Sequence, residues 1–335
     1  MKSDDEKIEN IEENNEEEKV LIKKKTVPSS HYGWFPDKRP ISELMNYGIV
    51  IIDKPAGPTS HQVSEYVKNI LNVRKAGHTG TLDPKVTGVL PVLINKSTKL
   101  ASILLGSDKE YIGIMHLHKD IPQYLIYNVT EEFVGKIKQI PPLKSAVKRR
   151  ERTRTIYYFK ILEIDGRDVL FKVGTQGGTY IRKLVHDIGE KLGCGAHMSE
   201  LRRTKAGGFS EESNMITLQT LEDAKYYYDE EGKENFLRYC IQPVESALKS
   251  IKKIWVLDGA VNSICHGAPL AIPGVYKLDD SIIKGERIAL LTAKGELIGI
   301  GESTMSSKEI IMNNTGICAK IDSVILKEEV YPSVI

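Results

Sequence analysis

The stretch that most restricts the fold runs from Lys75 to Pro91, with the sequence KAGHTGTLDPKVTGVLP. Its three glycines and two prolines are too many for a helix and interrupt any strand. One carboxylate, Asp83, stands before Pro84 in the middle of the stretch. A helix pattern precedes it and the apolar run GVLPVLI follows, which predicts a loop held between two regular elements. Taken alone, a turn aspartate before proline remains the ordinary interpretation.

Strand and helix patterns alternate around this loop, from about residue 47 to residue 250. The run YGIVIIDKPAG is typical of a buried strand that ends in a turn. The run TSHQVSEYVKNILNV predicts a helix with Thr59 or Ser60 as its N-cap. Further on, VLFKVGTQGGTYIRKLVHDIGEKLG predicts a strand, a glycine turn and a helix with one apolar face. We therefore expect an α+β domain with a mixed sheet over residues 47–250.

The pattern changes at about residue 251. GERIALLTAKGELIGIGES contains two apolar runs joined at Lys294 and Gly295, which is a hairpin pattern. Short strands separated by glycine and proline continue to Leu326, so we predict a small β-barrel over residues 251–328, followed by a C-terminal tail over 329–335.

The formal charge of +2 conceals an acidic beginning. Residues 1–18 carry nine acids and two lysines, a net charge of −7, which leaves +9 for the rest of the chain. A basic body is compatible with a polyanionic partner and equally with a solvated surface. Residues 1–26, poor in apolar side chains, are expected to be a disordered acidic tail. The four cysteines are far apart and are expected to be reduced thiols, mostly buried.

Several common chemistries have no motif in this sequence. It contains no phosphate-binding G-x-x-x-x-G-K-[ST] loop, no dinucleotide fingerprint and no G-x-S-x-G nucleophile turn. His116 and His118 in MHLHKD have a spacing that a metal site could use, but no further ligand motif is near them. Core or surface histidines are therefore the preferred interpretation.

The motifs of the chain, in their order, resemble those of the TruB-type pseudouridine synthases. The resemblance covers roughly residues 34–326 and is closest to the guide-RNA-dependent branch that includes dyskerin. It rests on DKPAGPTSHQV, KAGHTGTLDPKVTGVLP, KEYIGIMHLH, PPLKSAVKRRERTRT, GGTYIRKLVHDIGEKLG and MSELRRTKAGGF. It implies that residues 47–250 are the catalytic domain and that the barrel is a PUA domain, an RNA-binding module. Residues 27–46 would be an N-terminal extension that packs on this barrel.

The resemblance also implies a reaction, the isomerisation of uridine to pseudouridine, in which no atom is gained or lost and no cofactor is needed. Asp83 would be the catalytic aspartate, acting either as a nucleophile at C1′ or as a base at C2′. An ionised carboxylate suits a transition state that gathers positive charge on the sugar. Arg182 corresponds to the arginine that keeps this aspartate ionised and aimed. Lys54 is expected to brace the strand end beside the loop.

Four further residues match the family's substrate pocket. Tyr111 matches the tyrosine that stacks on the target base and is a candidate for removing the C5 proton. Tyr180 and Leu201 match residues that line the pocket, although a core role for Tyr180 remains open. His78 matches a histidine that fills the space left by a flipped nucleotide in relatives that modify tRNA, and loop bracing is an equal alternative.

The basic stretch LKSAVKRRERTRT occupies the position of the family's mobile thumb loop, which clamps substrate RNA through phosphate contacts. Its cations are Lys144, Lys148, Arg149, Arg150, Arg152 and Arg154. Stand-alone enzymes that act on tRNA have a tyrosine where this chain has Lys144, and a second element that this chain lacks. The guide-dependent branch therefore fits better, although Thr79 matches the stand-alone form.

The guide-dependent branch implies particular partners. An H/ACA guide RNA would present the target uridine of ribosomal RNA, and two small accessory proteins and a kink-turn-binding protein would complete the complex. The composition favours an archaeal cytoplasmic enzyme. Two alternatives are a stand-alone synthase for the T-loop uridine of tRNA and a non-catalytic RNA scaffold; the presence of Asp83, Tyr111 and Arg182 argues against the scaffold.

Overall fold

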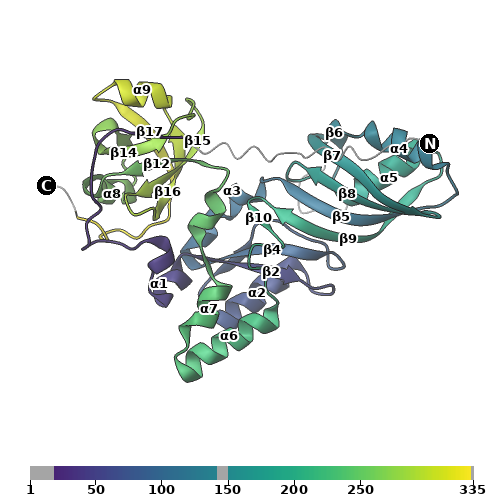
Figure 1. Ribbon diagram of the computed structural model, residues 1–335, viewed down its shortest axis with the longest axis horizontal. Helices are drawn as coiled ribbons and strands as arrows, with labels where there is room; N and C mark the ends of the chain where they lie inside the picture. Colours follow the sequence, from purple (N-terminus) through teal and green to yellow (C-terminus); the bar gives the residue numbers. More distant parts are fainter. Residues whose placement is uncertain (1–18, 142–149, 333–335) are drawn as a thin grey trace, which may run out of the picture.

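The computed structural model describes residues 19–141 and 150–332, which form a large and a small domain (Figure 1). Within these residues, a ten-stranded mixed sheet organises the large domain and a seven-stranded sheet the small one. The expected α+β class with two domains of this kind is confirmed. None of the described helices is both long enough and apolar enough to cross a membrane.

The large sheet has the strand order β11-β2-β4-β9-β5-β8-β7-β6, with β3 beside β4 and β10 beside β9. Its strands are β2 (Gly48–Lys54), β3 (Ala76–His78), β4 (Thr87–Ile94), β5 (Lys109–Leu117), β6 (Gly135–Gln139), β7 (Arg152–Asp165), β8 (Asp168–Thr175), β9 (Ala196–Ala206), β10 (Phe209–Ser210) and β11 (Gln242–Pro243). The helices around it are η1 (Pro36–Lys38), α1 (Ile41–Asn46), α2 (Ser60–Leu71), η2 (Asn95–Leu100), α3 (Ala101–Leu105), α4 (Gln123–Glu131), α5 (Ile181–Lys191), α6 (Leu218–Glu231), α7 (Glu234–Cys240) and η3 (Val244–Leu248).

The large sheet consists of two halves. The near half is β11, β2, β4 and β3, and the far half is β9, β5, β8, β7, β6 and β10. The halves meet where β4 pairs with β9 in parallel through two residue pairs, Thr87 with Arg202 and Gly88 with Arg203. We call this place the seam. Figure 1 shows α2, α6 and α7 beside the near half, and α4 and α5 beside the far half.

The surroundings of strand β2 explain why apolar and polar residues do not alternate in its sequence. Ile49 and Ile51 belong to a cluster that continues into the small domain, whereas Val50 and Ile52 pack into the cluster beneath α2, α6 and α7. Because both faces of the strand are covered, every one of these side chains is buried. The predicted buried strand is confirmed.

The two amphipathic helices are also confirmed. Helix α2 begins after Thr59, whose side chain accepts a hydrogen bond from the Gln62 backbone amide in a capping box. Helix α5 buries one face against the far half of the sheet, as its apolar spacing predicted.

The small domain contains β12 (Lys252–Val256), α8 (Asp258–Cys265), β13 (Leu270–Ala271), η4 (Ile272–Gly274), β14 (Val275–Asp279), β15 (Arg287–Thr292), β16 (Leu297–Ser303), α9 (Ser307–Met312) and β17 (Ile317–Val324). Strands β15 and β16 form the predicted hairpin. The strand order runs from β1 (Val20–Ile22) through β14, β12, β15, β16 and β17 to β13, and the sheet is a half-barrel where the sequence suggested a barrel.

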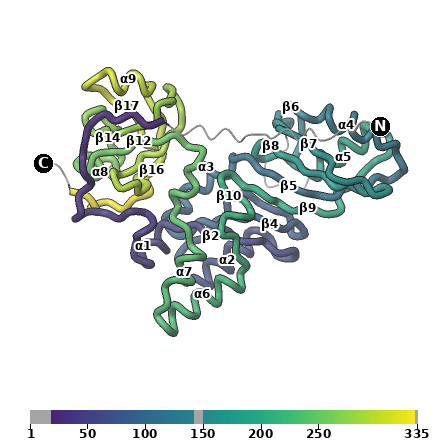
Figure 2. The backbone as a smooth tube through the Cα atoms, in the orientation of Figure 1, coloured from purple at the N-terminus to yellow at the C-terminus, as the bar shows by residue number. Residues whose placement is uncertain are grey.

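The expected disordered tail over residues 1–26 needs a correction at its end. Residues 1–18 lie outside the described residues, but Val20–Ile22 form strand β1, which pairs antiparallel with the edge strand β14. The Lys23 ammonium also binds the backbone carbonyls of Ile311 and Asn313 at 2.7 Å. Figure 2 shows this N-terminal chain running along the small domain before it reaches α1. The acidic composition concealed a short strand that an unpaired sheet edge can recruit.

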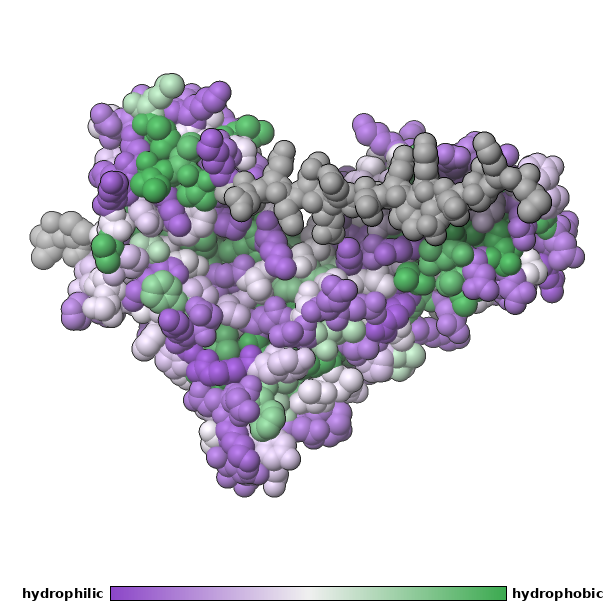
Figure 3. All heavy atoms as spheres, in the orientation of Figure 1, coloured by the Kyte–Doolittle hydropathy of each residue, from purple (hydrophilic) through white to green (hydrophobic). Residues whose placement is uncertain are grey.

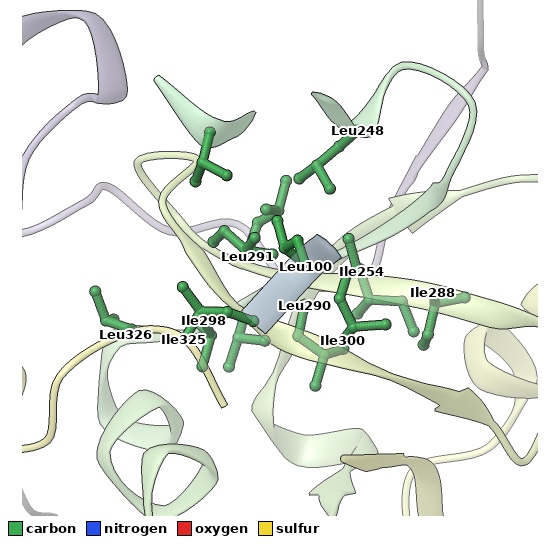
Figure 4. Packing of buried hydrophobic residues seen from close by; sticks show 14 of the residues in the cluster. Leu100, Leu248, Ile254, Ile288, Leu290, Leu291, Ile298, Ile300, Ile325 and Leu326 are labelled. Atoms are coloured by element: carbon green, nitrogen blue, oxygen red, sulfur yellow. The ribbon is translucent and has the colours of Figure 1, made fainter. Parts of the chain in front are cut away.

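The two domains share one hydrophobic core. Leu100 and Leu248 of the large domain pack in the same cluster as Ile254, Leu290 and Ile300 of the small domain (Figure 4). On the face shown in Figure 3, hydrophobic side chains are visible on both domains, between hydrophilic ones. The four cysteines are free and buried, as predicted. Because the core crosses the boundary, the orientation of the small domain is set by packing rather than by a linker.

Candidate active site

The loop that carries Asp83 joins β3 to β4. Hydrogen bonds to the buried Ser60 hold it in place. The Ser60 hydroxyl accepts a hydrogen bond from the Leu82 amide at 2.8 Å and donates to the Leu82 carbonyl at 3.1 Å. The Val86 amide donates to the Asp83 carbonyl at 3.0 Å and closes a turn around Pro84. These bonds fix the backbone on both sides of Asp83, so the direction of its side chain is determined by the fold.

Lys54 supports the same loop from the end of β2. Its fully buried ammonium donates to the carbonyls of Pro55, Pro84 and Val86 at 2.8, 3.0 and 2.9 Å. Burial lowers the pKa of Lys54, while the charge of Asp83 raises it. The predicted bracing role of Lys54 is confirmed, and it places a positive charge beneath the loop.

Arg182 faces Asp83 from the first turn of α5. Its Nε lies 2.8 Å from Asp83 Oδ2 and its Nη2 lies 3.1 Å from Oδ1, which is a two-point contact. The side chain of Asp83 is 43% exposed and that of Arg182 is 55% exposed, so the pair opens to solvent. The structure therefore brings together the two residues that are 99 positions apart in the sequence.

The other expected pocket residues lie on the far half of the sheet. Tyr111 on β5 and Leu201 on β9 come from adjacent strands, which pair antiparallel. Tyr111 is buried, whereas Leu201 is partly exposed. Tyr180 is the residue before α5, and the side chain of Gln139 binds its backbone amide at 3.0 Å and its carbonyl at 3.2 Å. Gln139 is a positioning group that the sequence patterns did not indicate.

His78 ends β3, and its Nδ1 lies 3.4 Å from the Gly80 amide, in the same loop as Asp83. Burial lowers the pKa of His78, and the charge of Arg203 acts in the same direction. The geometry places His78 beside the loop that carries Asp83.

The basic stretch is only partly described. Lys144, Lys148 and Arg149 lie outside the described residues. Arg150 is exposed, and Arg152 and Arg154 are partly buried on β7, where Arg154 donates to the Thr153 carbonyl at 2.7 Å.

The histidines of MHLHKD lie away from this site, at the far end of β5. His116 Nδ1 is 2.7 Å from Asp168 Oδ1, and His118 Nε2 is 3.0 Å from His197 Nδ1. Within residues 19–141 and 150–332, no group of three histidine, cysteine or acidic side chains is arranged to hold a metal ion.

Two buried cations near the loop were missed as site residues, although both stand in quoted motifs. Arg203 in MSELRRTKAGGF donates to the carbonyls of Val89 and Gly80. Lys109 in KEYIGIMHLH donates to the carbonyls of Leu104, Leu105 and Ser107 at 3.3, 3.1 and 2.5 Å. Lys109 stands between Asp108 and Glu110, and Arg203 between Arg202 and Thr204, so no local pattern indicated that either cation would be buried.

Comparison with known proteins agrees with this arrangement. Residues 68–124 and 119–181 match the N-terminal domain of the TruB family pseudouridylate synthases, and 182–249 match a tRNA pseudouridylate synthase B C-terminal domain. Probable tRNA pseudouridine synthase B of Pyrococcus abyssi is 49% identical over 314 residues, which are 93% of this chain and 94% of that protein. The chain belongs to the TruB family of pseudouridine synthases. It is thus an RNA isomerase.

Other similarities extend over most of this TruB-family chain. Residues 252–325 match the PUA domain, and 12–64 match the DKCLD (NUC011) domain. Probable tRNA pseudouridine synthase B of Methanosarcina barkeri is 52% identical over 320 residues, covering 95% of this chain and 94% of that one. In the crystal structure of the archaeal box H/ACA sRNP Nop10–Cbf5 complex, the similar chain has a TM-score of 0.87 and 44% identity, with 96% and 100% covered.

A Cbf5–Nop10–Gar1 complex contains a further similar chain, with a TM-score of 0.89, 48% identity and coverage of 96% of this chain and 98% of that one. The small domain of the protein is therefore a PUA domain, and the large one is the TruB catalytic domain.

Proposed function

We propose that this pseudouridine synthase isomerises uridines of ribosomal RNA under the direction of an H/ACA guide RNA, with Asp83 as the catalytic residue. The observation that carries the assignment of Asp83 is its two-point contact with Arg182 at a solvent-open position. A carboxylate on a fixed loop that makes a two-point contact with a cation keeps its orientation. A fixed orientation suits a group that must approach one atom of a ribose.

The reaction needs little else from the protein. The C1′–N1 bond breaks, the base turns, C5 bonds to C1′, and the C5 proton is removed while N1 regains one. Asp83 either attacks C1′ and is later displaced, or removes and returns the C2′ proton. In both routes its negative charge opposes the positive charge that develops on the sugar.

The target base must leave its helix to reach Asp83. Tyr111 and Leu201 supply an aromatic and an apolar wall from β5 and β9, and Tyr180 stands at the amino end of α5. Such walls offset an unstacking cost of about a few kcal/mol. Tyr111 is the candidate for stacking on the base and for removing the C5 proton, and His78 would stand in the loop near the nucleotide.

Guide dependence is supported by similarity along 94–96% of the chain. Solved structures with TM-scores of 0.87 to 0.89 come from H/ACA complexes, one of them bound to a substrate RNA containing 2′-deoxyuridine. Lys144 at the position of a family tyrosine points the same way. We infer that the protein binds accessory proteins similar to Nop10 and Gar1, and a kink-turn-binding protein. We also infer that it acts on ribosomal RNA in the cytoplasm.

The RNA would contact two regions, and a third segment would support one of them. The basic stretch with Lys144, Lys148, Arg149, Arg150, Arg152 and Arg154 would bind phosphates of the substrate. The PUA domain would hold the 3′ end of the guide. The extension that crosses it, residues 27–46, would stabilise this platform, since Lys294 donates to the carbonyls of Tyr32 and Gly33 at 2.5 and 3.0 Å.

A second candidate function is modification of the T-loop uridine of tRNA without a guide, because the curated relatives are named probable tRNA pseudouridine synthase B. The discriminating experiment incubates the protein with a ribosomal RNA fragment and with tRNA, each with and without a reconstituted guide complex. We expect pseudouridine in the ribosomal fragment only when the guide is present. Guide-independent modification of tRNA, with none in the guided fragment, would favour the second function.

A further inference from the structure

The residues of the proposed site come from both halves of the large sheet. Asp83 belongs to the loop before β4 in the near half, whereas Tyr111 and Arg182 belong to the far half. The backbone connection of β4 to β9 across the seam consists of two residue pairs. A junction this short can open or shear by small amounts unless side chains fasten it, and a catalytic pair placed across it would then lose its geometry.

Arg203 lies in the seam and is fully buried, with 1% of its surface exposed. Its Nε donates to the Val89 carbonyl at 2.8 Å and its Nη2 donates to the Gly80 carbonyl at 3.1 Å. The side chain of Tyr111 is close enough to the same guanidinium to raise its pKa. One side chain thus binds strand β4 and the loop that carries Asp83, and lies beside the tyrosine of the far half.

Arg203 is tightly packed in the seam. A Cβ atom on Gly88 would lie 2.2 Å from the Arg203 carbonyl oxygen, and Gly88 has a φ of +101°. A Cβ on Gly80 would lie 3.3 Å from Arg203 Nη1. Gly88 thus packs on the Arg203 backbone, and Gly80 lies next to the guanidinium that binds its carbonyl. A displacement of this guanidinium would therefore move the loop.

The charge of Arg203 is not matched by a carboxylate among the residues that the structure describes; no ion pair there includes it. Burial lowers the pKa of the Arg203 guanidinium, and the neighbouring Tyr111 opposes this effect. A buried cation without an opposite charge costs stability, whereas an apolar side chain of the same length would not. Such a residue is poorly explained by stability alone.

We propose that Arg203 is a positioning residue that holds the Asp83 loop in register with Tyr111 across the seam. This inference rests on the proposed function. Arg203 acts through the Gly80 carbonyl and through the Tyr111 hydroxyl and does not contact the substrate. Its contribution therefore belongs to the rate of the chemical step and not to the binding of RNA.

The first test replaces Arg203 by Met, which keeps the length of the side chain and removes both charge and donors. We expect single-turnover pseudouridine formation to slow by about 100-fold at saturating enzyme, the effect of a misplacement of about 1 Å. Affinity for guide-paired RNA should stay at the parent value. Arg203→Lys, which keeps the charge and can reach one carbonyl, should recover part of the rate.

Arg202→Gln is the matched control. Arg202 stands beside Arg203 in the seam but binds Asp53 and Glu211 and contacts neither Gly80 nor Tyr111. We expect this variant to lower the free energy of unfolding while its rate per folded molecule stays at the parent value. A rate loss as large as that of Arg203→Met would mean that the seam matters only as a structural joint, and would overturn the proposal.

A double-mutant cycle supplies the second readout. The cycle is measured on the free energy of unfolding: in a Tyr111→Phe background, which already lacks the hydroxyl partner, Arg203→Met should change this free energy by less than it does in the parent. Fully additive effects, or a parent-like rate in Arg203→Met and Arg203→Lys, would refute the inference. If Arg203→Met does not fold, Arg203→Lys and its cycle with Tyr111→Phe decide. An active Asp83→Asn protein would refute the proposed function instead, whatever the Arg203 variants do.

Discussion

Beneath the Asp83 loop, the buried cations Lys54, Lys109 and Arg203 bind backbone carbonyls. At the junction with the PUA domain, the buried cation Arg39 instead binds carboxylates. The first arrangement fixes a backbone and leaves positive charge near an anion that is needed for chemistry. The second neutralises charge and fastens two domains together.

The junction is an ion pair with additional hydrogen bonds. Arg39 donates to both oxygens of Glu245 at 2.8 Å and lies 3.9 Å from Glu296, which accepts a bond of 2.6 Å from the Tyr331 hydroxyl. Burial alone would lower the pKa of Arg39, but Glu245 raises it. The N-terminal extension, the catalytic domain, the PUA domain and the C-terminal segment meet at this point. The role of a buried charge therefore follows from its partners and not from its burial alone.

The largest effect on stability should follow removal of the junction cation. Arg39→Met leaves the partly buried Glu245 and the buried Glu296 close together without their cation, which is expected to lower the free energy of unfolding by about 3–5 kcal/mol. Pseudouridine formation per folded molecule should be unchanged. Urea unfolding of Arg39→Met beside the exposed-neighbour control Lys38→Met measures the effect. Equal stabilities for the two variants would contradict the junction's proposed role.

Lys54→Met should show the opposite pattern, a large loss of rate with a smaller loss of stability. The carbonyls of Pro55, Pro84 and Val86 lose their donor, while a buried charge is also removed. We expect single-turnover pseudouridine formation to slow by about 100-fold, because the loop is free to move by about 1 Å. If Lys54→Met lost as much stability as Arg39→Met and kept the parent rate, the proposed difference between the two regions would be wrong.

The cations of the basic stretch form a third class. The salt dependence of RNA binding should distinguish them from the buried cations. Arg150 is exposed and Arg152 is partly buried on the basic stretch, where they would meet RNA phosphates. Changing both to Ala should weaken substrate binding and lower the salt slope by about 1 for each phosphate that the variant no longer binds. Lys54→Met should leave the slope at its parent value. A slope that is insensitive to Arg150 and Arg152 would exclude them as phosphate-binding residues.

The smallest expected effect is the pH dependence contributed by Lys109. Burial lowers its pKa to about 8, and Arg203 acts in the same direction. Because the unfolded chain holds this proton up to a pKa of 10.5, it binds more protons than the folded chain between pH 8 and 10.5. The free energy of unfolding of the parent should therefore rise with pH in this window relative to Lys109→Met. A flat difference between the two proteins would contradict a buried, proton-releasing Lys109.

Much of this architecture follows from local patterns. The N-cap of α2, predicted at Thr59 or Ser60 and found at Thr59, and the hairpin at Lys294 and Gly295 are set by residues close in sequence, so local patterns indicated both. The association of Asp83 with Arg182 came from family resemblance, because 99 residues separate them and no local rule links them. The structure supplies this proximity directly.

Other features depend on contacts that no local pattern encodes. The Val20–Ile22 strand forms by pairing with the edge of β14. The acidic residues that precede it in the sequence led to the prediction of disorder. Arg203 and Arg202 are adjacent arginines of the same type, yet one is buried against carbonyls and the other pairs with acids. Successive side chains of β9 point to opposite faces of the sheet, so Arg202 and Arg203 meet different neighbours.

The most direct test of the account is Asp83→Asn, which keeps the size of the side chain and removes its charge. Single-turnover pseudouridine formation and affinity for guide-paired RNA are measured together for the parent and the variant. We predict parent-like RNA affinity and no detectable pseudouridine, because a neutral amide neither attacks the sugar nor stabilises its positive charge. Pseudouridine formation at the parent rate would contradict the catalytic assignment of Asp83, and loss of RNA binding would assign it a structural role instead.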